Sequence, residues 1–145
     1  MAPLFVLVVI TAIARLAGWL GDIAWLDSWS HAAALGLAAM FLLTATAHFA
    51  EPRRGALVAM VPPRLPNPGA WVALTGVLEI AGAIGLLIPA TAKLAAVCLA
   101  LMMIAMFPAN IRAARENLGI KTMPLPVRTL VQGVFLGAAA LVVFG

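Results

Sequence analysis

The stretch Trp71–Pro89, WVALTGVLEIAGAIGLLIP, is an apolar run of 19 residues that carries a single carboxylate, Glu79, near its middle. A helix of this length crosses the hydrocarbon core of a bilayer, which is about 30 Å thick. A carboxylate in hydrocarbon is costly, so it is protonated, paired or directed into a polar cavity, and by default it marks a functional site. Glu79 is therefore the first candidate for a functional residue.

The rest of the chain has the same apolar character. Of its 145 residues, 65% are hydrophobic and 10% are charged, and the mean hydropathy is +1.12. These values exclude a soluble globular domain. Apolar stretches of about 20 residues match membrane helices, whereas the strands of a membrane barrel would be shorter and would alternate polar with apolar residues. The sequence predicts an all-α transmembrane helical bundle that occupies residues 1–145 as a single domain.

Five spans are predicted, at about 3–20, 30–50, 71–89, 92–109 and 127–144. The first lacks the basic leader of a signal peptide and is expected to be retained; if it were cleaved, the other four would keep their orientation. The proline-rich segment 51–69 is expected to lie at the membrane interface, with one short amphipathic turn. Gly133 and Gly137 have the spacing that lets two helices approach closely, which favours a homo-oligomer.

The basic residues indicate an orientation. The formal net charge is +4, and most of the cations fall in two loops: Arg53, Arg54 and Arg64 in one, Arg112, Arg115 and Lys121 in the other. The positive-inside rule places both loops in the cytoplasm, with the amino terminus inside and the carboxyl terminus outside. We expect a multi-pass protein of the plasma membrane whose cations attract anionic lipids rather than nucleic acid.

Helical geometry then predicts the depth and direction of the polar side chains. Glu79 falls about 12–15 Å from the cytoplasmic boundary, Gln132 roughly 8 Å, and His48 and Asn110 close to it. Thr44 precedes His48 by one turn, and Thr75 lies one turn from Glu79 on a face of small residues, which mark helix contacts in membranes. The expected ligand-binding residues are Thr44, His48, Thr75, Glu79, Asn110 and Gln132. Glu79 and His48 are the candidates for proton transfer.

Structural roles remain open for the same residues. Glu79 could instead form a charge pair with His48, or with Arg15, which counts as about 18 Å deep and so lies at a similar level. Arg128 fits a headgroup anchor, and Asn110 fits the end of a helix. His48 could simply be solvated near the headgroups.

No metal or cofactor is expected to be encoded by the chain. Its two histidines, His31 and His48, are 17 residues apart on one predicted helix, which separates them by about 25 Å and prevents them from ligating one haem. The single cysteine, Cys98, excludes a self-contained iron–sulfur cluster and an internal disulfide. Zinc would need three or four ligands, and this sequence offers too few.

Several short motifs, in this order, resemble the DoxX family of small bacterial membrane proteins. They are Ala47–Phe49, Leu57–Pro62, Thr75–Ile80, Gly85–Pro89, Phe107–Asn110 and Arg128-x-x-x-Gln132. The resemblance covers about residues 34–141 and implies a four-helix core, to which the first span would be an addition. It also implies an association with quinone-linked oxidation of sulfur compounds beside a partner subunit, and with membrane redox complexes. The matching positions are His48, Glu79, Asn110, Arg128 and Gln132.

These observations predict a membrane subunit that holds a small apolar ligand with a polar head, such as a quinone, in a pocket that faces the cytoplasm. Glu79 would exchange a hydrogen bond or a proton with the head, and His48 would relay protons. Because no electron carrier is encoded, a redox partner subunit would complete the reaction. The alternatives are a binder or isomerase of lipid-like or sterol-like molecules, and a structural membrane anchor for a partner subunit. The sequence leaves open whether the chain is an enzyme.

Overall fold

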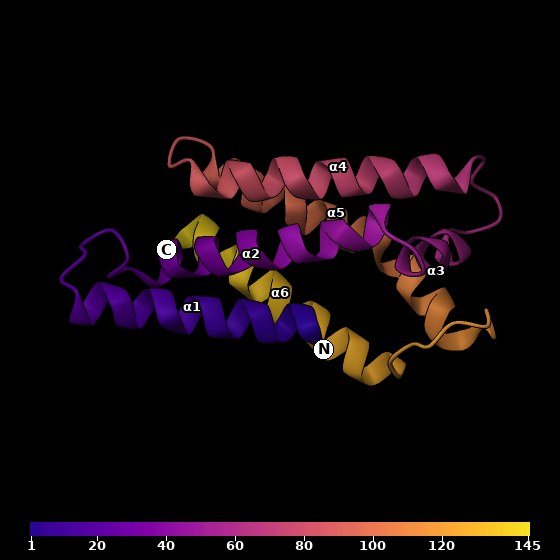
Figure 1. Ribbon diagram of the computed structural model, residues 1–145, viewed down its shortest axis with the longest axis horizontal. Coiled ribbons are helices and arrows are strands. Elements are labelled where there is room, and N and C mark those ends of the chain that lie inside the picture. The colour runs from indigo at the N-terminus through magenta and orange to yellow at the C-terminus, as the bar shows by residue number, and fades with distance from the viewer.

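The computed structural model describes all 145 residues and contains helices but no strands (Figure 1). The helices are α1 (Ala2–Leu20), α2 (Trp29–Phe49), α3 (Arg53–Met60), α4 (Pro68–Leu87), α5 (Ala92–Arg115) and α6 (Leu125–Phe144). All except α3 are long and apolar enough to cross a membrane. The predicted all-α fold is therefore confirmed, and the five long helices coincide with the five predicted spans.

Helix α2 is the centre of the bundle. It contacts the long helices α1, α4 and α6, and it also contacts the short helix α3 (Figure 1). Its first half is rich in alanine and glycine, and the run from Ala32 to Ala38 is almost completely buried. Small residues let neighbouring helices approach closely, and in a membrane this packing replaces the hydrophobic effect as the main force between helices. The small side chains of α2 thus explain why three long helices surround it.

Helix α5 is longer than the sequence predicted. The span was expected to end at residue 109 because Pro108 removes a backbone hydrogen bond, but the helix continues through Pro108 to Arg115. Membrane helices tolerate an internal proline when their neighbours support the freed groups. Here the last two turns pack against the segment that follows α3, and Ala113 is buried. The other span boundaries lie within three residues of the predictions.

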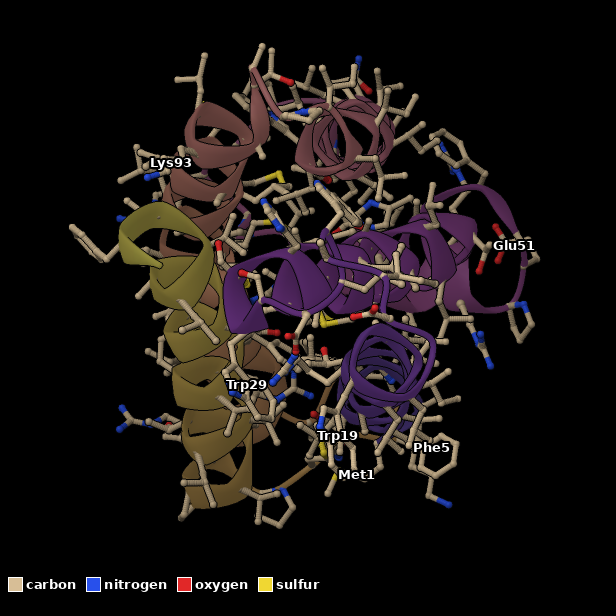
Figure 2. All side chains as sticks on the ribbon, turned by 90° about the vertical axis from the view of Figure 1, so that its left-hand side faces the viewer. Met1, Phe5, Trp19, Trp29, Glu51 and Lys93 are labelled. Atoms are coloured by element: carbon tan, nitrogen blue, oxygen red, sulfur yellow. The ribbon has the colours of Figure 1, made fainter.

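The connections between helices divide between two ends of the bundle. The 21–28 and 88–91 connections lie at one end together with the carboxyl terminus, whereas α3 and the 116–124 connection lie at the other (Figure 1). Both basic loops are therefore at the same end, which we call the basic end. Trp19 and Trp29 lie at the opposite end, the one that faces the viewer in Figure 2, and are 70% and 59% exposed. Aromatic residues at this level are typical of a membrane interface.

Arg112 holds α3 in place at the basic end. Its Nη1 donates hydrogen bonds of 2.8 Å to the Ala59 carbonyl and 2.7 Å to the Val61 carbonyl, and its Nε donates to Glu116 at 2.8 Å. The two carbonyls belong to the last turn of α3, where backbone acceptors have no partner within the helix. The sequence analysis used Arg112 only to orient the helices in the membrane. Its hydrogen bonds to backbone carbonyls of another helix could not be predicted, because every residue has a backbone carbonyl.

We therefore expect Arg112→Ala to loosen α3 without unfolding the bundle. Loss of hydrogen bonds from a charged donor costs about 1.5–3 kcal/mol, and α3 has no buried residue to compensate. Hydrogen–deuterium exchange of the α3 amides should accelerate in the variant, while exchange in α2 stays unchanged. Arg115→Ala, which removes a cation from the next turn of α5, serves as the control. Equal acceleration in both variants would contradict the anchoring role.

Candidate functional site

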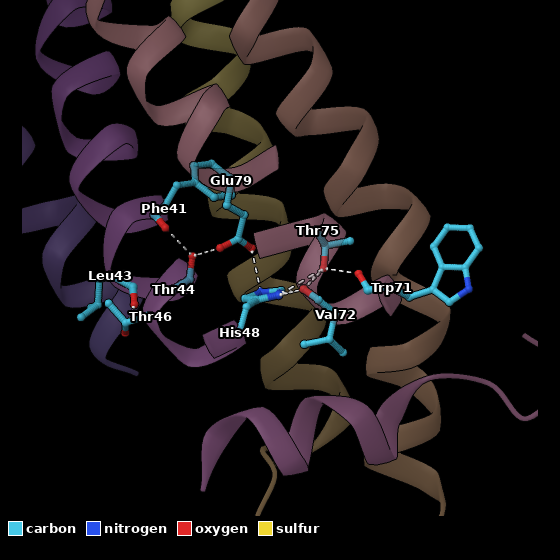
Figure 3. Close-up of polar contacts among 9 residues, drawn as sticks. All are labelled: Phe41, Leu43, Thr44, Thr46, His48, Trp71, Val72, Thr75 and Glu79. Atoms are coloured by element: carbon cyan, nitrogen blue, oxygen red, sulfur yellow. Dashed lines mark hydrogen bonds and ion pairs between the residues drawn. The ribbon is translucent and has the colours of Figure 1, made fainter. Parts of the chain in front are cut away.

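His48 and Glu79 form a buried pair between α2 and α4 (Figure 3). They are 3% and 5% exposed and are the only polar or charged residues in the buried set. His48 Nε2 lies 3.4 Å from Glu79 Oε1, and the other carboxylate oxygen accepts a 2.7 Å hydrogen bond from Thr44 Oγ1. The structure thus joins three of the predicted site residues in one polar cluster within the spans.

The hydrogen bonds of the histidine determine where its protons are. His48 Nδ1 lies 2.7 Å from the Val72 carbonyl. A carbonyl can only accept, so Nδ1 carries a hydrogen. At 3.4 Å from Glu79 Oε1, Nε2 fits either a protonated imidazole beside a carboxylate or a neutral imidazole beside the protonated acid. The pair therefore has no net charge in either state, which allows it to be buried in the bundle.

Thr75 is the fourth predicted residue in the cluster. Its Oγ1 lies 3.1 Å from His48 Nδ1 and also 3.1 Å from the Val72 carbonyl. The threonine and the carbonyl together fix the orientation of the imidazole ring (Figure 3). The sequence analysis did not identify the Val72 carbonyl as a partner of His48. A local indication was present, because a threonine in a helix, here Thr75, commonly donates to a carbonyl of the preceding turn.

The close approach of α2 and α4 depends on Gly76. A Cβ atom at this position would lie 2.6 Å from His48 Cβ and 2.8 Å from the nearest ring atom of Phe49. No other residue fits without separating the helices, because His48 Cβ is attached directly to the α2 backbone. Gly76 thus allows the imidazole to reach the Val72 carbonyl.

Arg15 does not pair with Glu79, so that interpretation is corrected. Its guanidinium instead forms an ion pair with Asp27 in the α1–α2 connection and lies 4.9 Å from the centre of the Trp29 ring. Arg15 is five residues from the end of α1, and a long cationic side chain near a helix end extends toward the interface. The two residues were predicted to lie at a similar depth in the membrane, but the structure does not bring their side chains together.

Asn110 and Arg128 form a second polar group that joins α5 and α6. Arg128 Nη1 donates a 2.6 Å hydrogen bond to Asn110 Oδ1, and Nη2 donates to Thr122 Oγ1. Arg128 Nε and Gln132 Nε2 are buried donors with no partner in the chain. No hydrogen bond connects this group to His48 or Glu79. The predicted single cluster is therefore two, one on α2 and α4 and one on α5 and α6.

An apolar groove lies between α4 and α5, and neither His48 nor Glu79 belongs to its lining. Its volume is about 190 Å³, and it is lined by Leu78, Ala81, Gly82, Cys98, Leu99 and Met102. Gly82 lies one turn from Glu79 on α4, so the groove and the carboxylate occupy adjacent faces of one helix. No group of three or more His, Cys, Asp or Glu side chains in the structure could hold a metal ion.

Comparison with known proteins corrects the resemblance to the DoxX family. The family model that matches the chain carries the description "Domain of unknown function (DUF8561)" and covers residues 37–142. Short motifs of Gly, Leu and Pro around single polar residues recur in membrane helices of different families, because the hydrocarbon limits their composition. No curated protein and no solved structure matches the chain. From residue 37 to residue 142, which includes α3, α4, α5, most of α2 and α6, and both polar groups, the chain belongs to the family of domains of unknown function DUF8561.

Proposed function

We propose that this protein is a membrane-embedded binding protein for a small ligand that has an apolar body and a polar head, such as a quinone. The body would lie in the groove between α4 and α5, and the head would exchange a hydrogen bond or a proton with Glu79. Because the family correction removes the argument from DoxX proteins, the proposal depends on chemistry alone. A redox partner subunit would supply the electrons for any reaction at a bound quinone.

The observation that supports this proposal is the buried contact of His48 with Glu79, 3.4 Å between Nε2 and Oε1. An intramembrane acid with a histidine partner can donate or accept a proton without leaving net charge in the bundle. The pair is 3% and 5% exposed, and the apolar groove begins one turn from the carboxylate. A ligand head that replaced Thr44 as the partner of Glu79 Oε2 would form a contact of the same kind.

The orientation that we propose places the basic end in the cytoplasm of a cell whose plasma membrane holds the bundle. His48 is the penultimate residue of α2, and α2 ends at the basic end. Protons that leave the pair through the imidazole would therefore emerge on the cytoplasmic side, as the positive-inside rule predicts from the two basic loops.

Ligand-dependent thermal stability tests this function. We expect a short-chain quinone to raise the melting temperature of the protein in mild detergent, because a ligand that binds the folded state stabilises it by about 2.7 kcal/mol at one hundred times its Kd. Glu79→Gln should abolish the rise, whereas Glu51→Gln, which alters an exposed carboxylate, should keep it. A larger rise with a sterol than with any quinone would favour the lipid-like alternative. No rise with either class would overturn the proposal.

A second candidate function, a structural anchor, is favoured by one observation. Both titrating side chains have partners inside the chain, since Thr44, Val72 and Thr75 supply contacts to the pair. A network whose polar groups are all satisfied within the chain is sufficient to hold α2 against α4 and requires no ligand. In that case Glu79→Gln should lower the melting temperature of the ligand-free protein, and neither quinone nor sterol should change it.

A further inference from the structure

The basic end contains a cavity that is separate from the His48–Glu79 pair. It has a volume of about 540 Å³ and lies between the segment after α3 and the last turns of α5. Its lining consists of three prolines, three arginines, one isoleucine and one glutamate: Pro62, Pro63, Arg64, Pro108, Ile111, Arg112, Arg115 and Glu116. Three guanidinium groups therefore face one carboxylate, and the cavity is positively charged.

The walls of this cavity are held in place by Arg112. Its hydrogen bonds to the Ala59 and Val61 carbonyls fix the start of the Pro62–Arg64 segment against α5. Proline restricts the backbone further, and two consecutive prolines lie in this segment. Glu116 is already paired with Arg112 Nε at 2.8 Å. The carboxylate is thus engaged and does not compete for the other two arginines.

Arg64 and Arg115 are the free cations of the cavity. Both are exposed, and neither belongs to one of the three ion pairs of the chain. Two guanidinium groups on opposite walls can bind the oxygens of one phosphate, because each presents a planar fork of donors. The cavity lies between the end of α5 and the segment that connects α3 to α4, which in a membrane is the level of the headgroups.

We propose that this cavity binds the phosphate of an anionic phospholipid headgroup, with Arg64 and Arg115 as the contacting residues. Basic pockets between membrane helices on the cytoplasmic side have the chemistry that recognises such headgroups. Helix α3 directly precedes the Pro62–Arg64 wall of the cavity, and its apolar residues Leu57, Val58 and Met60 are only partly buried, so they would provide a surface for an acyl chain. A soluble phosphate compound would gain nothing from this apolar surface. The site is independent of the function proposed for His48 and Glu79.

Lipid titration in detergent, read by native mass spectrometry, tests the site. We expect phosphatidylglycerol to bind with a preference over phosphatidylcholine, and Arg64→Gln with Arg115→Gln to weaken its apparent affinity about thirtyfold, since each guanidinium that contacts the phosphate directly contributes roughly fivefold. Arg53→Gln is the matched control, because Arg53 is an exposed arginine of the same end outside the cavity lining. It should change the affinity by less than about twofold.

Three results would overturn the proposal. One is an unchanged affinity in the double variant, and another is an equal loss in the Arg53→Gln control. The third is protection of the protein against heat by inorganic phosphate to the same extent as by phosphatidylglycerol, which would assign the cavity to a soluble anion. The double variant should melt like the unsubstituted protein in the absence of lipid, because both side chains lack partners within the chain.

Discussion

Gly76→Ala is expected to separate α2 from α4 and to cost about 1–3 kcal/mol of stability, the usual effect of an added methyl group in a closely packed contact. The new Cβ would lie 2.6 Å from His48 Cβ. The ring of Phe49, which is half exposed, can turn aside, but His48 Cβ moves only with the α2 backbone. The imidazole would then be withdrawn from the Val72 carbonyl, 2.7 Å away in the native structure. Thermal melting of the variant in detergent measures the effect.

Gly133→Ala is the matched control for this prediction. It makes the same change within a spanning helix, and nothing lies within 4 Å of a Cβ atom at that position. Because alanine is a better helix former than glycine by about 1 kcal/mol, the melting temperature of the monomeric protein should stay the same or rise. Equal losses for the two glycines would show that close packing at Gly76 does not stabilise the bundle.

The spans and half of the site could be predicted from the sequence because both depend on local information. Hydrocarbon thickness sets the length of each helix, and the positions of Thr44 and Thr75 one turn from His48 and Glu79 follow from the helical period. The small residues around Glu79 correctly indicated that its face of α4 contacts another helix. In the structure Ala83, on that face, is fully buried.

The partners of the polar residues could not be predicted, because depth gives the level of a side chain and not its direction around the helix axis. Arg15 was placed at the level of Glu79, but it extends to Asp27 at the end of α1. Asn110 was grouped with His48, but it accepts a hydrogen bond from Arg128 of α6, and the amide nitrogen of Gln132 is buried without a partner in the chain. Which helix each side chain faces depends on the packing of the whole bundle, with α2 at its centre. No residue pattern along one helix contains that information.

The sequence also could not show what Gly133 and Gly137 contact, because their spacing does not identify the neighbouring helix. Their spacing is typical of helices in close contact, yet no atom of the chain lies within 4 Å of a Cβ atom at either position. The contact that the spacing favours is therefore not made within one chain, and the expected homo-oligomer through this face of α6 stays a prediction.

Replacing Glu79 with methionine is expected to destabilise the bundle more than replacing Glu79 and His48 together. The single change leaves His48 Nε2 buried without a partner, and an unsatisfied buried group costs about 1–3 kcal/mol. In the double variant, Glu79→Met with His48→Leu, the neighbouring groups keep other partners. Thr44 Oγ1 still donates to the Phe41 carbonyl at 3.1 Å, and the Val72 carbonyl still accepts from Thr75.

Unfolding free energies of the two single variants and the double variant, measured by titration with a denaturing detergent, give the coupling energy of the pair. We expect a coupling of about 1 kcal/mol or more, because contacting residues of one network are not additive. The same cycle applied to Thr46 and Glu51, an exposed pair on the same side of the bundle, should give a value near zero. Additive losses for His48 and Glu79 would mean that the two side chains do not interact, and both functions proposed for the pair would then lose their physical basis.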